Sequence, residues 1–148
     1  MLMNKTEKIV QLLKQKIENK TILEVACGTA DFSLAASQYA KEIICIDIES
    51  GRLNDCIHEQ ENIHFEKMDA SNMTFENEVF DTIILYNSLY HIHDQYDQIM
   101  GECKRVLKKS GEIIIIGTWK IDISLMIEKF DNQAEVLKEY CIVKIGKN

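Results

Sequence analysis

The sequence predicts an α/β fold with a doubly wound, mostly parallel sheet, helices on both faces and one C-terminal antiparallel strand. Short apolar runs rich in β-branched residues alternate along the chain with stretches of helical spacing. The connections between these runs are long enough for right-handed crossover helices, which make consecutive strands parallel. No internal repeat, linker or low-complexity stretch interrupts the alternation, so residues 1–148 are expected to form a single domain.

The first half of the chain alternates helix and strand from its start. Asn4 and Glu7 can form a capping box ahead of apolar residues at helical spacing, which predicts an amphipathic helix. A β-branched run then breaks into small residues between Ala26 and Ala30, which indicates a strand and a tight turn. The expected elements are helices over 5–19 and 31–40, a third helix that Ser50 caps with Leu53, Cys56 and Ile57 inward, and strands over 21–25, 42–47 and 63–69, the last near a sheet edge.

The second half continues the pattern. Asp94 can cap a helix between two apolar runs, and Ser110-Gly111 can end that helix at a left-handed residue. The expected elements are strands over 80–86 and 112–118 with a helix over 94–108 between them, then helices over 124–130 and 132–140, the latter with Val136 and Leu137 inward, and one strand over 141–147. This last strand is expected to pair antiparallel with 112–118.

Charge and composition exclude several classes of protein. The formal net charge of −7 disfavours nonspecific binding to nucleic acid or to an acidic membrane, because both require a basic surface. No apolar run approaches the ~18 residues that span a bilayer, and the N-terminus lacks a signal-peptide core, so a cytoplasmic location is expected. The five cysteines are scattered without a C-x-x-C pair, which predicts neither a zinc site nor a disulfide framework.

The turn after the first strand is the candidate ligand loop. Small residues there bring backbone N–H groups close to a ligand at a helix N-terminus, where a carboxylate or phosphate is favoured. A dinucleotide loop of the form G-x-G-x-x-G, laid on Ala26, Gly28 and Asp31, would put an acid where its third glycine allows close packing. The spacing therefore disfavours a dinucleotide, and a nucleotide-binding oxidoreductase is the weaker alternative.

Three acids lie at or near the ends of predicted strands. Glu24 is in the first strand, Asp47 closes the second and Asp69 closes the third. Ligands of open α/β sheets bind at the carboxyl ends of strands, where the strand order reverses. An acid about twenty residues after the turn can accept both hydroxyls of a ribose, and Asp47 has that spacing. Each acid alone is better explained as a loop or capping residue. All three at corresponding places predict a site for an adenosine-containing cofactor.

These motifs, in this order, resemble those of class I S-adenosylmethionine-dependent methyltransferases that act on small molecules. The resemblance runs from about Lys5 to Thr118, and the turn CGTAD is also similar to the quinone-methylating branch of that superfamily. It implies a Rossmann-like fold, S-adenosylmethionine as the cofactor and methyl transfer to a small-molecule acceptor. The matching segments are 22–33, 46–48, 68–70 with Met73 and Phe75, 80–81 leading to 87–92, Glu102 with 105–108, and 111–112.

Carried over to this sequence, the resemblance implies four contacts to the adenosine part of the cofactor. Asp47 binds the ribose hydroxyls, and Ile48 packs on the adenine. Asp69 accepts from the adenine amino group, while the Ala70 N–H donates to the ring. Asp47 closes the second predicted strand and Ile48 follows it. Asp69 closes the third predicted strand and Ala70 follows it.

The resemblance also implies contacts to the methionine part. The residues expected there are Ala26, Gly28 and Thr29, then Glu24, which reaches the ammonium group through water, and Tyr86, whose carbonyl accepts from it. Ala26 and Ala30 depart from the family, which usually has glycine at both positions. Their methyl groups would crowd the turn if its backbone needs a positive φ.

Methyl transfer requires the protein mainly to hold an acceptor in line with the methyl group. A general base is needed only where the acceptor must lose a proton. His91 is a candidate for that base, and its alternative is a structural histidine beside the following helix. No third ligand with suitable spacing joins His91 and His93, so no metal is expected. Asn87 is not followed by the two prolines and the aromatic residue of amino-directed nucleic-acid methyltransferases, which disfavours a DNA base as the acceptor.

The C-terminal segment departs most from the family, which closes its sheet with two further strands and often adds lid helices. Room for a single strand predicts an unusual sheet edge and an open acceptor site, or a homodimer in which a second subunit completes that site. A catalytic methyltransferase is the leading hypothesis. The alternative is a non-catalytic or partner-dependent S-adenosylmethionine-binding protein whose short tail leaves the acceptor site incomplete.

Overall fold

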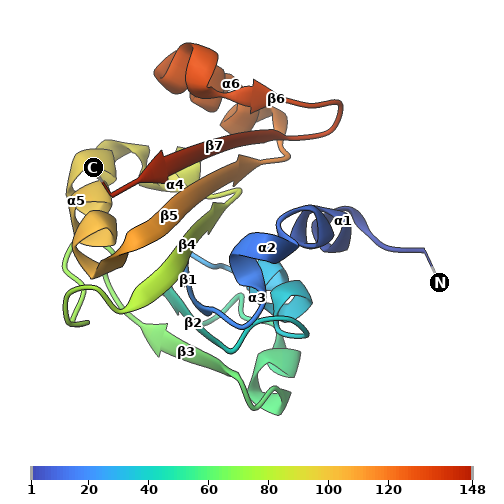
Figure 1. Cartoon of the computed structure of the whole chain (residues 1–148), viewed down its shortest axis with the longest axis vertical. Coiled ribbons are helices and arrows are strands. Elements are labelled where there is room, and N and C mark those ends of the chain that lie inside the picture. The colour runs from blue at the N-terminus through green and yellow to red at the C-terminus, as the bar shows by residue number, and fades with distance from the viewer. Residues whose placement is uncertain (1, 148) are drawn as a thin grey trace.

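The computed structural model describes residues 2–147 and contains one seven-stranded sheet (Figure 1). Its strands are β1 (Thr21–Val25), β2 (Glu42–Asp47), β3 (Ile63–Lys67), β4 (Phe80–Tyr86), β5 (Leu107–Gly117), β6 (Glu135–Val136) and β7 (Cys141–Gly146). The order across the sheet is β3-β2-β1-β4-β5-β7-β6. The pairs from β3 to β5 are parallel, and β7 is antiparallel to both of its neighbours. The predicted Rossmann-like α/β class and its C-terminal antiparallel strand are confirmed.

Helices cover both faces of this sheet (Figure 1). One face carries α1 (Lys5–Leu12), α2 (Lys14–Ile17), α3 (Asp31–Ala36) and the 3-10 helix η1 (Asp55–Glu59). The other face carries α4 (Leu89–Ile92), α5 (Tyr96–Val106) and α6 (Lys120–Phe130). The short 3-10 helices η2 (His93–Gln95) and η3 (Asp131–Gln133) adjoin these last three helices. Because successive strand residues point to opposite faces, β4 sends Ile83 and Leu85 into one core and Ile84 into the other. Both faces are therefore buried, as a doubly wound sheet requires.

One of the three predicted helix caps is confirmed, and several helices end early. The predicted Asp94 cap is wrong, because α5 begins at Tyr96 with Gln95 as its N-cap and without a side-chain capping hydrogen bond. The Asn4 side chain accepts from the Glu7 N–H at 2.8 Å, so the predicted cap of α1 is confirmed. Leu13, with φ −96° and ψ 13°, then separates α1 from α2, so the expected single helix is two. Asn54 rather than Ser50 caps η1, and Cys56 is exposed instead of buried.

Gly111 does not stop a helix as expected. The chain leaves α5 at Leu107, which pairs with Phe80, so the residues from 107 onward already belong to β5. A Cβ at Gly111 would lie 2.5 Å from Leu107 Cδ1 and 2.7 Å from the Asp81 carbonyl oxygen. Close packing within the sheet, and not a left-handed helix end, accounts for glycine at this position.

The C-terminal expectation of one strand and an open edge is wrong. The stretch expected as a helix over 132–140 forms η3, β6 and a turn in which the Leu137 N–H donates to the Tyr140 carbonyl at 2.8 Å. Asp131, with φ 49° and ψ −122°, ends α6, and Val136 remains 56% exposed because no surface lies over it. β6 pairs with the start of β7, so seven strands are present and the predicted reason for a homodimer is removed.

No helix within residues 2–147 combines the length and the apolar character that crossing a membrane requires.

Candidate functional site

A cavity of about 600 Å³ lies at the carboxyl ends of β1 to β5, over the point where the strand order reverses between β1 and β4. Its wall receives residues from the segment that follows each of these strands. The predicted site residues that line it are Ala26, Gly28, Thr29, Asp47, Ile48, Asp69, Ala70, Tyr86 and His91. Glu24 is the predicted site residue that the structure does not bring to this wall.

The turn between β1 and α3 has an alternating left-handed backbone. Ala26, Gly28 and Ala30 have φ of 54°, 56° and 65°. Such alternation directs backbone N–H groups towards a concavity that suits an anion. Within the described residues 2–147, the Thr29 N–H donates no hydrogen bond, so it is free to meet a ligand. Ala26 and Ala30 therefore both have the positive φ that disfavours a Cβ. This is the backbone conformation in which their methyl groups are predicted to crowd the turn.

Asp47 joins the end of β2 to this turn. Its Oδ2 accepts from the Gly28 N–H at 2.8 Å, and its Oδ1 accepts from the Glu49 N–H at 3.1 Å. A carboxylate has about four acceptor positions on its two oxygens, so each oxygen retains one for a further donor. Asp47 is thus oriented by the backbone and still able to receive a pair of hydroxyl groups.

The segment after β3 provides a second acid. Ser71 donates to Asp69 Oδ1 from its N–H at 2.9 Å and from its hydroxyl at 2.7 Å. These hydrogen bonds lower the pKa of Asp69, so it remains a carboxylate, and its Oδ2 is left for other donors. The N–H of Ala70 is unpartnered within residues 2–147. Ile48, which lines the same cavity, is 65% exposed although it is apolar. A carboxylate, a free N–H and an uncovered apolar side chain form a slot suited to a planar base.

Glu24 lies beneath the turn instead of in the cavity. Its side chain is 1% exposed, and Oε1 accepts from the Ser33 N–H at 3.1 Å and from the Ser33 hydroxyl at 2.7 Å. Burial raises the pKa of Glu24 to about 8, so the group is protonated at neutral pH. It ties β1 to α3, and its predicted contact with an ammonium group stays a prediction.

The far end of the cavity lies between β4, β5 and α1. The Tyr86 hydroxyl is 2.7 Å from Thr6 Oγ1, which joins the end of β4 to α1. Asn87 Nδ2 donates to Thr118 Oγ1, and the Thr118 N–H donates to Asn87 Oδ1, each at 2.7 Å. Asn87 has a φ of 53°, a conformation that asparagine tolerates better than most residues. This reciprocal pair holds the ends of β4 and β5 together at the cavity rim.

His91 reaches the cavity and His93 does not. His91 is exposed, and its ring makes no hydrogen bond within residues 2–147. His93 Nδ1 is 2.6 Å from the Tyr90 carbonyl oxygen, and Nε2 is 3.2 Å from Asp94. The two rings therefore do not converge, and no cluster of potential metal ligands is found across the described residues.

Sequence reasoning did not anticipate several residues of the wall, namely Lys5, Thr6, Cys27, Arg52, Gln95, Ile99, Thr118 and Trp119. Trp119 follows the strand predicted over 112–118 and is 50% exposed in the cavity wall. The Cys27 thiol is not activated, because a hydrogen bond with Cys45 and burial raise its pKa. The helical residues Lys5 and Ile99 carried no signal, since only the tertiary fold brings their helices to the cavity.

The fold and this cavity define an α/β protein with a site for an adenosine-containing cofactor. The chain belongs to the methyltransferase domain family, which matches residues 23–115. It is 32% identical over 102 residues to demethylmenaquinone methyltransferase from Staphylococcus haemolyticus, covering 65% of this chain and 42% of that protein. It is 25% identical over 138 residues to phthiotriol/phenolphthiotriol dimycocerosates methyltransferase from Mycobacterium leprae, covering 82% and 51%.

The chain thus spans about half the length of these relatives. Among solved structures, the fold matches a SAM dependent methyltransferase from Aquifex aeolicus with a TM-score of 0.69 and 17% sequence identity. That alignment covers 93% of this chain and 86% of the Aquifex chain. The overlap in fold therefore includes most of both chains.

Proposed function

We propose that this chain is an S-adenosylmethionine-dependent methyltransferase that acts on a small-molecule acceptor. Membership of the methyltransferase domain family supports the reaction class. The observation that carries the proposal is the convergence of the left-handed turn, Asp47 and Asp69 around one cavity. A cavity of about 600 Å³ is within the range of small-molecule sites.

The residues of the wall fit this cofactor. Asp47 would hold the ribose hydroxyls, since each of its oxygens retains an acceptor position. Asp69 and the Ala70 N–H would bind the amino and ring positions of adenine, and the ring would cover Ile48. The methionine part would lie along the turn, with Ala26, Gly28 and Thr29 beside it and the Tyr86 carbonyl at its ammonium group.

The protein's own part in the reaction is placement. S-adenosylmethionine, when bound, supplies a methyl group that is already activated by its sulfonium. The reciprocal Asn87–Thr118 pair stiffens the rim, and Trp119 offers an exposed apolar face against which an acceptor can be held. Holding reactants in line can contribute several kcal/mol. His91, at the same end, would receive a proton from acceptors that must lose one.

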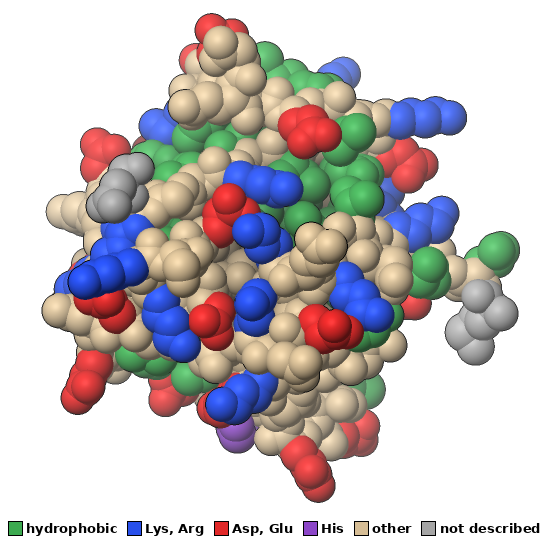
Figure 2. Space-filling model, viewed as in Figure 1, with side chains coloured by type: hydrophobic (Ala, Val, Ile, Leu, Met, Phe, Trp, Pro, Cys, Tyr) green, Lys and Arg blue, Asp and Glu red, His purple; other side chains and the backbone are tan. Residues whose placement is uncertain are grey.

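We also propose that the acceptor is not a nucleic acid and that the chain works in the cytoplasm as one domain. On the face shown in Figure 2, Lys and Arg side chains are interspersed with Asp and Glu side chains, without a broad basic field. A net charge of −7 supports the same proposal. The relatives named for demethylmenaquinone and for phthiotriol and phenolphthiotriol dimycocerosates support an organic acceptor.

Thermal unfolding with S-adenosylmethionine, S-adenosylhomocysteine and NAD in parallel tests the cofactor. A ligand at ~100 times its dissociation constant stabilises by about 2.7 kcal/mol. We expect a rise in Tm with the two adenosyl sulfur compounds and none with NAD, and loss of the rise in Asp47→Ala but not in the exposed control Glu59→Gln. A rise with NAD alone would support an oxidoreductase instead.

Formation of S-adenosylhomocysteine in the presence of candidate acceptors then tests catalysis. Production that depends on an acceptor supports the enzyme. Tight cofactor binding without turnover on any acceptor would favour the non-catalytic or partner-dependent alternative.

A further inference from the structure

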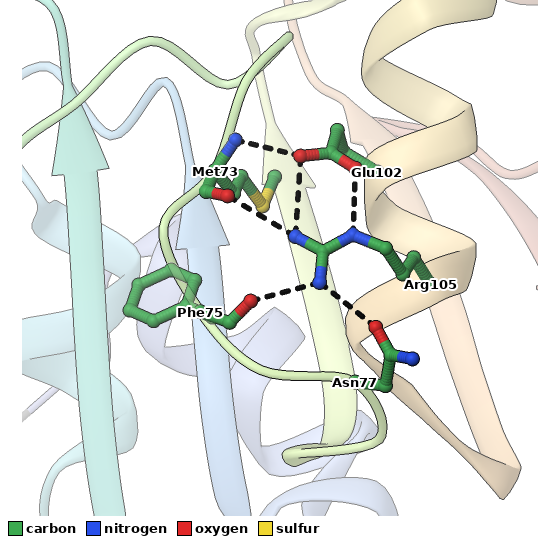
Figure 3. Close-up of polar contacts among 5 residues, drawn as sticks. All are labelled: Met73, Phe75, Asn77, Glu102 and Arg105. Atoms are coloured by element: carbon green, nitrogen blue, oxygen red, sulfur yellow. Dashed lines mark hydrogen bonds and ion pairs between the residues drawn. The ribbon is translucent and has the colours of Figure 1, made fainter.

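Two groups of residues in the matched motifs have no part in the cofactor site described above. Met73 and Phe75 lie in the loop between β3 and β4, and Glu102 and Arg105 lie on α5. The structure brings them into one polar cluster (Figure 3). We call the ion pair at its centre the Glu102–Arg105 clamp.

The clamp holds the loop through its backbone. Arg105 donates from Nη1 to the Phe75 carbonyl at 2.8 Å and to Asn77 Oδ1 at 2.9 Å, and from Nη2 to the Met73 carbonyl at 3.1 Å (Figure 3). Glu102 Oε1 accepts from the Met73 N–H at 2.7 Å. Main-chain bonds close the loop further along, from the N–H groups of residues 78 and 79 to the carbonyls of residues 105 and 106.

The two side chains also fix each other. Arg105 Nε donates to Glu102 Oε2 at 2.8 Å, and Nη2 donates to Oε1 at 3.2 Å. This is the two-point geometry that a planar guanidinium makes with a carboxylate and that lysine cannot reproduce. The Arg105 side chain is 32% exposed and that of Glu102 is 20% exposed, so the pair is partly shielded from water.

The clamped loop continues directly from the purine end of the cavity. Asp69 begins a turn in which its carbonyl accepts from the Asn72 N–H at 3.0 Å while its carboxylate accepts from Ser71. Met73 follows Asn72, and its N–H donates to Glu102 of the clamp. The segment from Asp69 to Met73 is therefore held by hydrogen bonds within its own turn and attached to α5 at Met73.

The same helix also contributes to the cavity wall. Ile99, three residues before Glu102, is buried and lines the wall. Attachment of the loop to α5 thus sets where Asp69 and Ala70 lie relative to Ile99. Phe75 packs edge-on against Phe80 at 5.1 Å between ring centres, which anchors the loop to β4 as well.

We propose that Glu102 and Arg105 are positioning residues that hold Asp69 at the place where it distinguishes adenine from purines without an amino donor. This inference rests on the proposed function. A well-placed Asp69 oxygen accepts from the amino group of adenine, whereas the carbonyl oxygen of hypoxanthine at the same ring position repels the carboxylate. Discrimination depends on the position of Asp69, and the clamp determines that position.

The test measures binding of S-adenosylhomocysteine and S-inosylhomocysteine to the full chain by calorimetry, with folding of each variant checked by circular dichroism. For wild type we expect S-adenosylhomocysteine to bind about tenfold or more tightly, because a single well-made hydrogen bond to a carboxylate is at stake. In Arg105→Met we expect this ratio to fall towards one, mainly through loss of affinity for S-adenosylhomocysteine. Arg105→Lys and Glu102→Gln, which disturb the cluster less, should give intermediate ratios if Arg105→Met is too unstable.

Lys104→Met is the matched control, since it removes a neighbouring positive charge from the same helix outside the cluster. It should leave the ratio unchanged. Combination with Asp69→Asn gives a double-mutant cycle, which we expect to be non-additive because both changes remove the same discrimination.

An unchanged ratio in a folded Arg105→Met protein would overturn the inference, and so would an equal loss of affinity for both ligands that adds to the effect of Asp69→Asn. Those outcomes would leave the clamp a contributor to stability alone. Failure of wild type to bind either ligand is a different result: it would overturn the proposed function and this inference with it.

Discussion

Gly28 and Asp47 are joined by a hydrogen bond in which the Gly28 N–H donates to Asp47 Oδ2 at 2.8 Å. The bond ties the turn after β1 to the end of β2, so the acid that we propose for ribose binding also shapes the loop proposed for the methionine part. Stability and cofactor affinity are therefore coupled at this residue.

Asp47→Asn should weaken both properties. Hydrogen bonds to a charged group contribute about 1.5–3 kcal/mol, so we expect the affinity for S-adenosylhomocysteine to fall roughly 10- to 100-fold. We expect unfolding free energy to fall by about 1 kcal/mol, because the carboxylate that receives the Gly28 N–H loses its charge. Calorimetry and denaturant unfolding measure the two effects, with Glu59→Gln as a control that removes an exposed acid. Wild-type affinity in Asp47→Asn would contradict the ribose assignment.

Ala26→Gly and Ala30→Gly should differ although both residues are left-handed. Relief of a left-handed alanine is worth about 1 kcal/mol. Ala26 is partly exposed in the cavity wall, so Ala26→Gly should stabilise the protein by about 0.5–1 kcal/mol. Ala30 is fully buried, and loss of its methyl costs about 0.8 kcal/mol, which leaves Ala30→Gly nearly neutral. The denaturant midpoints of the two variants and of wild type measure these differences in stability. A destabilised Ala26→Gly protein would contradict the strain argument.

Glu24→Gln should alter the pH dependence of stability. Burial raises the folded-state pKa to about 8, with Asp31 and Asp47 adding to the rise and Ser33 opposing it, while an unfolded glutamate titrates near 4.3. Between these values the folded state holds one proton more, so this stabilisation is complete below pH ~4 and is lost as pH rises through about 8. The slope approaches about 1.4 kcal/mol per pH unit.

Glutamine keeps an acceptor for Ser33 and does not ionise. Glu24→Gln should therefore flatten the decline in unfolding free energy between pH 5 and 8, as measured by urea unfolding at a series of pH values. The decline should persist in the control Glu18→Gln. If the unfolding free energy of Glu24→Gln declined equally steeply with pH, the decline would come from ionisable groups other than Glu24.

His91→Gln tests the candidate base once an acceptor is converted. General base catalysis contributes roughly 10²–10⁴-fold, so we expect kcat to fall within that range while the affinity for S-adenosylhomocysteine stays the same. His93→Gln is the matched control, since His93 lies two residues away and does not line the cavity. A normal kcat in His91→Gln would mean that placement alone supports the reaction on that acceptor.

The residues that line the proposed cofactor half of the cavity could be predicted because their signals are local. A β-branched run predicts a strand, and an acid that ends a parallel strand must lie at the carboxyl edge of the sheet, as Asp47 does. The turn from Ala26 to Ala30 could be predicted for the same reason, since small residues directly after a buried strand indicate a tight turn. The position of the Glu24 side chain could not be predicted in this way, because it is hydrogen-bonded to Ser33, nine residues away, beneath the turn.

The sequence by itself determined which segments form β1 to β4 and most of β5, the class of fold and the ends of the strands that meet at the cavity. Tertiary structure alone decided that residues 132–140 form β6 and a turn, because their weak helical pattern found no surface to cover while the start of β7 offered backbone partners. It also decided that Arg105 meets Phe75, thirty residues away. Local propensity selects an element where burial supports it, whereas the end of an element and the partner of a charged side chain depend on contacts that are distant in sequence.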